Sequence, residues 1–218
     1  MPVWKSCGKE KSFINNWQIA SYPSKNDVFT KMENLKKYIS TITAFSEQSW
    51  TILCDCLTEI EFRKNELLLK EGQVCNAVFF ISAGLCKSFY NLDGKYINTG
   101  FYFENDFATN IKSLTTSAKS EYSIIACEKT AVVRLDKTKL LQAYSQSHQI
   151  ETFGRKVLEL ITTKQEEQAN SFKLLTPKQR FDSLVLHHPD FLQRVSLTQI
   201  ASYLGISRET LSRFRAAK

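Results

Sequence analysis

The chain has 218 residues, of which 43% are hydrophobic and 23% are charged. That length allows one large domain or two small ones with a buried core, and this balance excludes a disordered or collagen-like chain. No apolar stretch approaches the roughly 18 residues of a membrane span, and the N-terminus has no apolar secretory signal. We therefore expect a cytoplasmic protein with no membrane partner.

Charge is placed unevenly along the chain. Residues 173–218 carry eight Lys or Arg against three acidic residues, a net charge of +5, whereas residues 32–172 carry 16 against 17, a net charge of −1. A basic end on a near-neutral body predicts that this end meets a polyanion, although a solvated basic face would give the same pattern. The six cysteines include no C-x-x-C pair. They are interpreted as reduced, buried thiols, and no metal or other cofactor is expected.

The N-terminal region combines a weak pattern with a helical one. Residues 1–31 mix Lys, Asn and isolated aromatic residues, and we expect a weakly ordered arm there. A helical pattern begins directly after Met32, which leaves open that translation starts at this residue. Apolar residues at spacings of three and four predict helices over residues 33–60, with a helix start at Ser46.

From residue 61 onward the hydrophobic period is that of strands. Short apolar runs are separated by turn signals, the strongest of which is Asp93-Gly94. The predicted strands cover residues 78–81, 85–92, 96–102, 122–126 and 130–135. Short strands at regular intervals predict an antiparallel sandwich or barrel.

A second helical region follows, and its main element is a long helix over about residues 148–174. Its apolar stripe is narrow, and so long a helix is hard to bury in a small protein. We therefore expect it to pair with its copy in a second subunit, with packing on the chain's own β domain as the alternative. The residues assigned to the dimer helix are Phe153, Val157, Leu160, Ile161 and Gln168.

Residues 197–216, LTQIASYLGISRETLSRFRA, have the pattern of a helix-turn-helix. Ser196 with Gln199 predicts a capping box at the first helix, and Gly205 permits the tight turn. The inward-facing residues predicted for the two helices are Ile200, Ala201, Leu204, Thr210, Leu211 and Phe214.

The outer face of the second helix carries Arg208, Glu209 and Arg213. Arg pairs with the edge of guanine and Glu can accept from the amine of cytosine, so this face suits DNA base edges. Glu209 could instead complement the N-terminus of the helix.

The string SRETLSR, after the turn Leu204-Gly205-Ile206, resembles the recognition helix of the cyclic-AMP receptor / fumarate-nitrate regulator (Crp/Fnr) superfamily. The segment from Leu67 to Phe107 is similar to the β-roll of that family, and the order of elements agrees from about residue 33 to residue 218. The resemblance implies an α+β fold: an N-terminal antiparallel β-roll (a cyclic-nucleotide-binding-like jelly roll) with flanking helices, a long dimerisation helix and a C-terminal winged helix-turn-helix. Any wing would come from the segment around His188–Val195.

The resemblance also implies a division of the chain and a function. The expected parts are the arm (1–31), a sensor domain (32–147), the dimerisation helix (148–175) and a DNA-binding domain (176–218). The implied function is that of a homodimeric, sequence-specific transcriptional regulator of double-stranded DNA, and not of an enzyme. By the family pattern Arg208, Glu209 and Arg213 contact bases. The residues that would contact phosphates are Ser196, Thr198, Ser207, Ser212 and Arg215. RNA polymerase and an unknown small-molecule effector are left open as further partners.

The chain departs from the cyclic-nucleotide receptors at their effector pocket. The family's Gly-Glu positions fall on Thr109 and Asn110, and its Arg-Ser positions fall near Ser120 and Glu121. Glu121 would repel a phosphate, and Lys112 lacks the bidentate geometry of arginine. We therefore expect a degenerate pocket that binds neither cAMP nor cGMP; its residues are Phe107, Thr109, Asn110, Lys112, Ser120 and Glu121. The alternative function is a sensor module that responds to another small ligand and regulates a protein partner.

Overall fold

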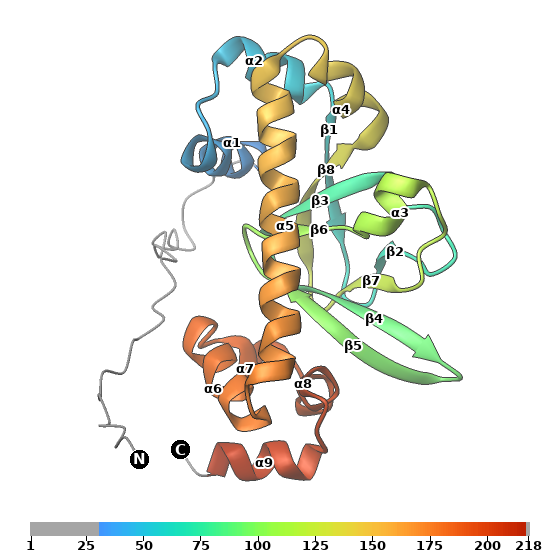
Figure 1. The fold of residues 1–218 in the computed structure, drawn as a ribbon, viewed down its shortest axis with the longest axis vertical. Helices are drawn as coiled ribbons and strands as arrows, with labels where there is room; N and C mark the ends of the chain where they lie inside the picture. The colour runs from blue at the N-terminus through green and yellow to red at the C-terminus, as the bar shows by residue number, and fades with distance from the viewer. Residues whose placement is uncertain (1–30, 217–218) are drawn as a thin grey trace, which may run out of the picture.

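The computed structural model describes residues 31–216, so the arm predicted over residues 1–31 lies, apart from Lys31, outside the described residues. The chain begins with helices α1 (Lys31–Ile42) and α2 (Glu47–Cys54), and the hydroxyl of Ser46 caps α2, as predicted. Eight strands follow, with two short helices among and after them (Figure 1). The strands are β1 (Leu57–Phe62), β2 (Leu67–Leu69), β3 (Ala77–Ala83), β4 (Cys86–Leu92), β5 (Lys95–Tyr102), β6 (Phe107–Ala108), β7 (Ser123–Ala126) and β8 (Thr130–Asp136). The two short helices are α3 (Ile111–Thr116) and α4 (Lys137–Tyr144).

The strands form two four-stranded sheets, with the orders β1-β8-β3-β6 and β2-β7-β4-β5. All their pairings are antiparallel, so the antiparallel sandwich expected from the strand pattern and the β-roll implied by the resemblance are confirmed. Asp93 and Gly94 form the tight turn between β4 and β5, and both have positive φ angles, which is why the Asp-Gly pair predicts a hairpin there.

The helix predicted over residues 33–60 ends too late. The structure ends α2 at Cys54 and begins strand β1 at Leu57, which pairs with Leu135 of β8. The physical reason is visible in the alternation of Ile60 and Phe62 with two glutamates, which is the period of a half-buried strand.

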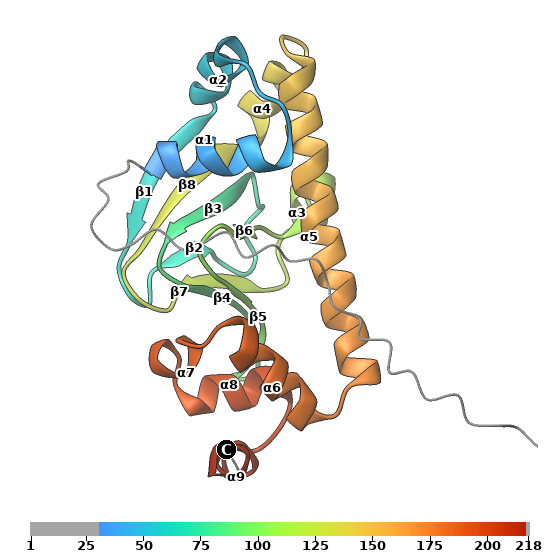
Figure 2. The same cartoon turned by 90° about the vertical axis from the view of Figure 1, so that its left-hand side faces the viewer.

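The larger core lies between the first sheet and the helices that cover it. Phe80 of β3, Phe107 of β6 and Phe153 of the long helix are buried together, and Leu35 and Ile39 of α1 close the same cluster. The long helix is α5 (His148–Leu174), with the predicted bounds, and it runs past the whole length of the β-roll (Figure 2).

Four helices complete the chain: α6 (Pro177–His187), α7 (Phe191–Arg194), α8 (Leu197–Leu204) and α9 (Arg208–Ala216). Thr176 and Gln179 form a reciprocal capping box at α6, with Pro177 in its first turn. The segment around His188–Val195, in which a wing was expected, contains the short helix α7 and no strand. Within residues 31–216, no helix is both long and apolar enough to cross a membrane.

Candidate nucleic-acid interface

Helices α8 and α9 meet at a tight turn centred on Gly205. Gly205 ends α8 with a φ of +69°, a conformation that glycine adopts readily because it has no Cβ. Its N–H donates to the carbonyls of Ala201 and Ser202, and the N–H of Ile206 donates to the carbonyl of Ala201 at 3.0 Å. The turn therefore satisfies the last carbonyls of α8 and sets the direction in which α9 leaves.

A small apolar core holds the two helices together. Four of the predicted inward-facing residues are buried, namely Ile200, Ala201, Leu204 and Leu211, and the other two, Thr210 and Phe214, are half-buried. Phe181 of α6 packs beside Phe214 of α9, with ring centres 6.1 Å apart. Because this core uses the inner face of α9, the outer face of α9 remains in solvent.

The outer face of α9 carries the predicted base-contacting residues. Arg208, Glu209 and Arg213 are all exposed. The Glu209 carboxylate accepts a hydrogen bond from its own backbone N–H and another from the Ser207 hydroxyl, and both lower its pKa. The carboxylate is therefore ionised at neutral pH and complements the N-terminus of α9, which is the second role that its sequence position allows.

The predicted phosphate-contacting residues lie around the same surface. Ser196 caps α8 and Ser207 caps the first turn of α9, where its Oγ accepts from the N–H of Thr210 at 3.1 Å. Thr198, Ser212 and Arg215 are exposed, as are both capping serines. The free N–H groups of a helix's first turn favour anions, so the start of α8 suits a phosphate.

The side of α8 away from α9 is docked on the β-roll. The N–H of Asn98 in β5 donates to the hydroxyl of Ser202 at 3.1 Å, and the amide of Asn98 donates to the carbonyl of Gln199 at 3.0 Å. Phe101 of β5 contacts Phe191 and Tyr203 edge-on, with ring centres 4.8 and 5.2 Å apart. The sequence contains no signal for this contact, because its two sides are about a hundred residues apart.

The side chains at the predicted effector positions form hydrogen bonds or ion pairs with other groups of the same chain. The amide of Asn110 donates to the hydroxyl of Ser120 at 2.8 Å, and its oxygen accepts from the N–H of Ser113. The hydroxyl of Thr109 donates to the carbonyl of Ala77 at 2.9 Å, and all these side chains are buried. Lys112 and Glu121 form an exposed ion pair with each other.

A cavity of about 310 Å³ lies between the second sheet and α5. Of the predicted effector residues only Phe107 lines it. Its walls also include Tyr38, Tyr90, Tyr102 and Tyr122, and its only charged lining groups within the described residues are Lys164 and Asp106, which pair at 2.6 Å. The pKa values of Tyr102 and Tyr122 are both raised, chiefly by burial, so these two tyrosine side chains are uncharged at neutral pH. A larger surface depression of about 630 Å³ along α6 is separate from both sites.

The comparisons with known proteins agree with this architecture. Residues 59–147 match the family model of the cyclic nucleotide-binding domain. FixK2 from Bradyrhizobium japonicum has 23% identity and a TM-score of 0.61, covering 74% of this chain and 83% of its own. A structure from Eubacterium rectale, described as a regulator of the Crp/Fnr family, has 15% identity and a TM-score of 0.60, covering 79% of this chain and 83% of its own. The chain has the Crp/Fnr fold. A search of curated proteins finds no match to this sequence.

A third structure with the same fold is described by the molecule to which it responds. CLP from Xanthomonas campestris, described as a c-di-GMP-responsive global regulator, has 13% identity and a TM-score of 0.60, covering 79% of this chain and 91% of its own.

Within the Crp/Fnr fold of this chain, α5 does not present the residues assigned to its dimer seam. Phe153, Val157 and Ile161 are 1%, 3% and 8% exposed and lie in the chain's own core. The amide of Gln168 donates to the carbonyl of Thr99 at 2.5 Å, and Leu160 is half-buried at the cavity. The assignment was wrong for the three core residues, because the narrow apolar stripe of α5 covers the β-roll.

Proposed function

We propose that the protein is a sequence-specific DNA-binding transcriptional regulator that acts as a homodimer. The observation that carries this proposal is the exposed outer face of α9, which presents Arg208, Glu209 and Arg213 from a helix fixed by a buried core. In this reading residues 32–147 form the sensor, 148–175 the dimerisation helix and 176–218 the DNA-binding part. We propose that the protein binds DNA in the cytoplasm and catalyses no reaction. RNA polymerase remains open as a further partner.

The chemistry of the outer face of α9 supports base recognition. An arginine can donate two parallel hydrogen bonds to the O6 and N7 atoms of guanine, and a carboxylate can accept from the N4 amine of cytosine. Hydroxyls at helix starts and Arg215 would hold the phosphates, which positions the helix without reading sequence. The test is binding to duplex DNA that weakens steeply with salt and depends on sequence.

A different stripe of α5 supports pairing with a second copy. Leu158, Thr162, Gln165, Ala169 and Phe172, here called the outer stripe, follow one another at spacings of four and three, and all are exposed. This is the 3.5-residue period of a two-helix seam, and Leu158 and Phe172 are large apolar side chains that are 38% and 41% exposed. We propose that two copies pair through the outer stripe.

We also propose that the degenerate pocket binds neither cAMP nor cGMP. A cyclic nucleotide would need the hydrogen bonds of Thr109 and Asn110 to break, and it would bring its phosphate toward Glu121. The lysine that could neutralise that phosphate is paired with Glu121 itself. Leaving such buried polar groups unpaired costs about 1–3 kcal/mol each.

Isothermal titration calorimetry of the purified protein should therefore show no saturable binding of either nucleotide up to millimolar concentrations. A receptor known to bind cyclic nucleotides, run under the same conditions, serves as the control. Micromolar binding, or an affinity for DNA that rises tenfold when a nucleotide is added, would contradict this proposal.

A further inference from the structure

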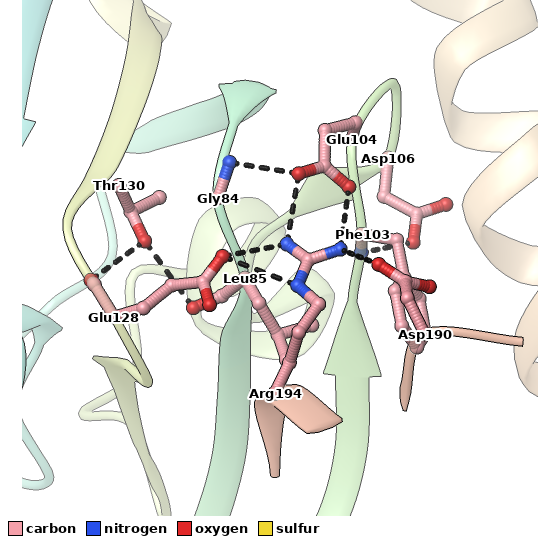
Figure 3. A network of polar contacts seen from close by, with 9 residues as sticks. All are labelled: Gly84, Leu85, Phe103, Glu104, Asp106, Glu128, Thr130, Asp190 and Arg194. Atoms are coloured by element: carbon pink, nitrogen blue, oxygen red, sulfur yellow. Dashed lines mark hydrogen bonds and ion pairs between the residues drawn. The ribbon is translucent and has the colours of Figure 1, made fainter. Parts of the chain in front are cut away.

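One arginine joins the helix-turn-helix to the end of the β-roll. The guanidinium of Arg194 in α7 donates to both carboxylate oxygens of Glu104, at 2.8 and 3.1 Å, and to one oxygen of Glu128, at 2.7 and 3.2 Å. It also donates to Asp190 at 2.9 Å (Figure 3). Two of the three carboxylates thus belong to the β-roll, whereas Arg194 and Asp190 belong to the C-terminal helices.

The two glutamates come from separate turns of the β-roll. Glu104 follows β5 and Glu128 precedes β8, and Glu104 also accepts from the N–H of Gly84, in the turn after β3, at 2.9 Å. Gly84 has a φ of +95°, and a Cβ there would lie 2.7 Å from the carbonyl oxygen of Lys129. The turn at Gly84 is therefore packed tightly against the turn at Lys129, and we call Glu104 and Glu128 on these turns the socket of Arg194.

The guanidinium of Arg194 neutralises the carboxylates that surround it. The side chain of Arg194 is 16% exposed, and those of Glu104 and Glu128 are 24% and 34% exposed. Burial lowers the pKa of Arg194, but hydrogen bonds and charge from the three carboxylates outweigh burial and raise that pKa above its ordinary value. Without the guanidinium, the two partly buried carboxylates of Glu104 and Glu128 and the exposed carboxylate of Asp190 would lie close together and repel.

Aromatic contacts beside Arg194 also pack the C-terminal helices against the β-roll. Phe103 stacks on His188 with ring centres 3.4 Å apart and planes 5° apart, and burial lowers the pKa of His188 to about 4, so its ring is neutral at neutral pH. Phe101 packs on Phe191 on the same side. The contacts of Arg194 and of these aromatic rings therefore belong to one docked interface between the C-terminal helices and the β-roll.

We propose that Arg194 is a positioning residue for DNA recognition: it holds the helix-turn-helix in the orientation that binds DNA, without touching DNA itself. This inference rests on the proposed function. The docked orientation leaves the outer face of α9 in solvent, and α9 lies at the end of the molecule farthest from α2 (Figures 1 and 2). A helix-turn-helix that is already oriented loses less conformational freedom on binding, and two of them can engage two half-sites at once.

The test compares Arg194→Gln with wild type on a duplex selected by the wild-type protein and on a random duplex. We expect Arg194→Gln to lower affinity for the selected duplex at least tenfold and for the random duplex less than twofold. Arg194→Lys keeps the charge but not the paired hydrogen bonds, so its affinity for the selected duplex should lie between those of wild type and Arg194→Gln. Arg134→Gln is the matched control, since Arg134 is a partly buried arginine paired with Asp136 on β8, outside α5 and the C-terminal helices, and it should change neither affinity.

Two further measurements separate positioning from a general loss of structure. Glu104→Gln combined with Arg194→Gln should weaken selected-duplex binding little more than Arg194→Gln alone, because both act through one contact. Hydrogen exchange without DNA should be faster in α8 of Arg194→Gln, while α5 keeps its protection.

Unchanged or increased affinity of Arg194→Gln for the selected duplex, equal losses on both duplexes, or unchanged exchange in α8 would each overturn the inference. If the wild-type protein itself does not distinguish any duplex from random DNA, the proposed function fails instead, and the exchange experiment still decides whether Arg194 fixes the docked orientation.

Discussion

Thr162→Asp is expected to make the protein monomeric, where we propose a dimer, and to lower affinity for a selected palindromic duplex at least a hundredfold. Thr162 lies in the middle of the outer stripe of α5, so the substitution places one aspartate of each copy at the proposed seam, where two like charges would meet. Losing the dimer also loses the avidity of two half-sites, which is worth about 10²–10⁴ in affinity. Light scattering measures the mass, and fluorescence anisotropy measures the binding.

The adjacent residue supplies the control. Thr163 is equally exposed, but one residue further along the helix turns it by about 100° away from the outer stripe. Thr163→Asp should remain dimeric with unchanged DNA affinity. Aspartate at Val157 or Ile161 would not serve this purpose, because both side chains lie in the chain's own core and the variants would unfold. A dimeric Thr162→Asp protein would show that the outer stripe is not the interface.

Arg213→Ala is expected to cost about 1–3 kcal/mol of binding free energy on the selected duplex and to relax one base position in each half-site. Arg208→Ala should behave alike, and Glu209→Ala should change base preference more than it changes affinity for random DNA. The reason is that a base contact contributes only where the matching base is present, whereas a phosphate contact contributes on every duplex.

Arg215→Ala is the matched comparison on the same helix. As a proposed phosphate contact, Arg215 should weaken selected and random duplexes alike and reduce the dependence of log affinity on log salt by about one unit. Competition binding with single-base variants of the selected duplex measures both effects. Equal losses on both duplexes for Arg208, Glu209 and Arg213 would show that these residues do not read bases.

Local signals in the sequence predicted most of the elements correctly. Ser196 with Gln199 marks the start of α8, and Gly205 marks the turn before α9, because each depends only on a few neighbouring residues. The strand β1 was missed although Ile60 and Phe62 alternate with glutamates, since the apolar stripe of α2 continues without a break to Leu57.

The contacts between distant segments could not be predicted. Periodicity shows that Val157 faces something apolar, but it does not distinguish the chain's own sheet from a second copy. Arg194 meets Glu104 and Glu128 only because helix α7 and two turns far apart in the sequence converge, and no spacing in the sequence encodes that meeting. The exposure of the proposed base-contacting residues was predictable, because an amphipathic helix buries one face and leaves the other in water.

Sequence-specific DNA binding is tested most directly by selecting duplexes from a random pool with the purified full chain and footprinting the enriched duplexes. The proposed dimer predicts enrichment of a palindrome whose two half-sites lie about one helical turn, roughly 10 base pairs, apart, with binding that falls steeply as salt is raised. A pool that remains random after repeated rounds, or binding with no dependence on sequence, would contradict the function proposed for α9.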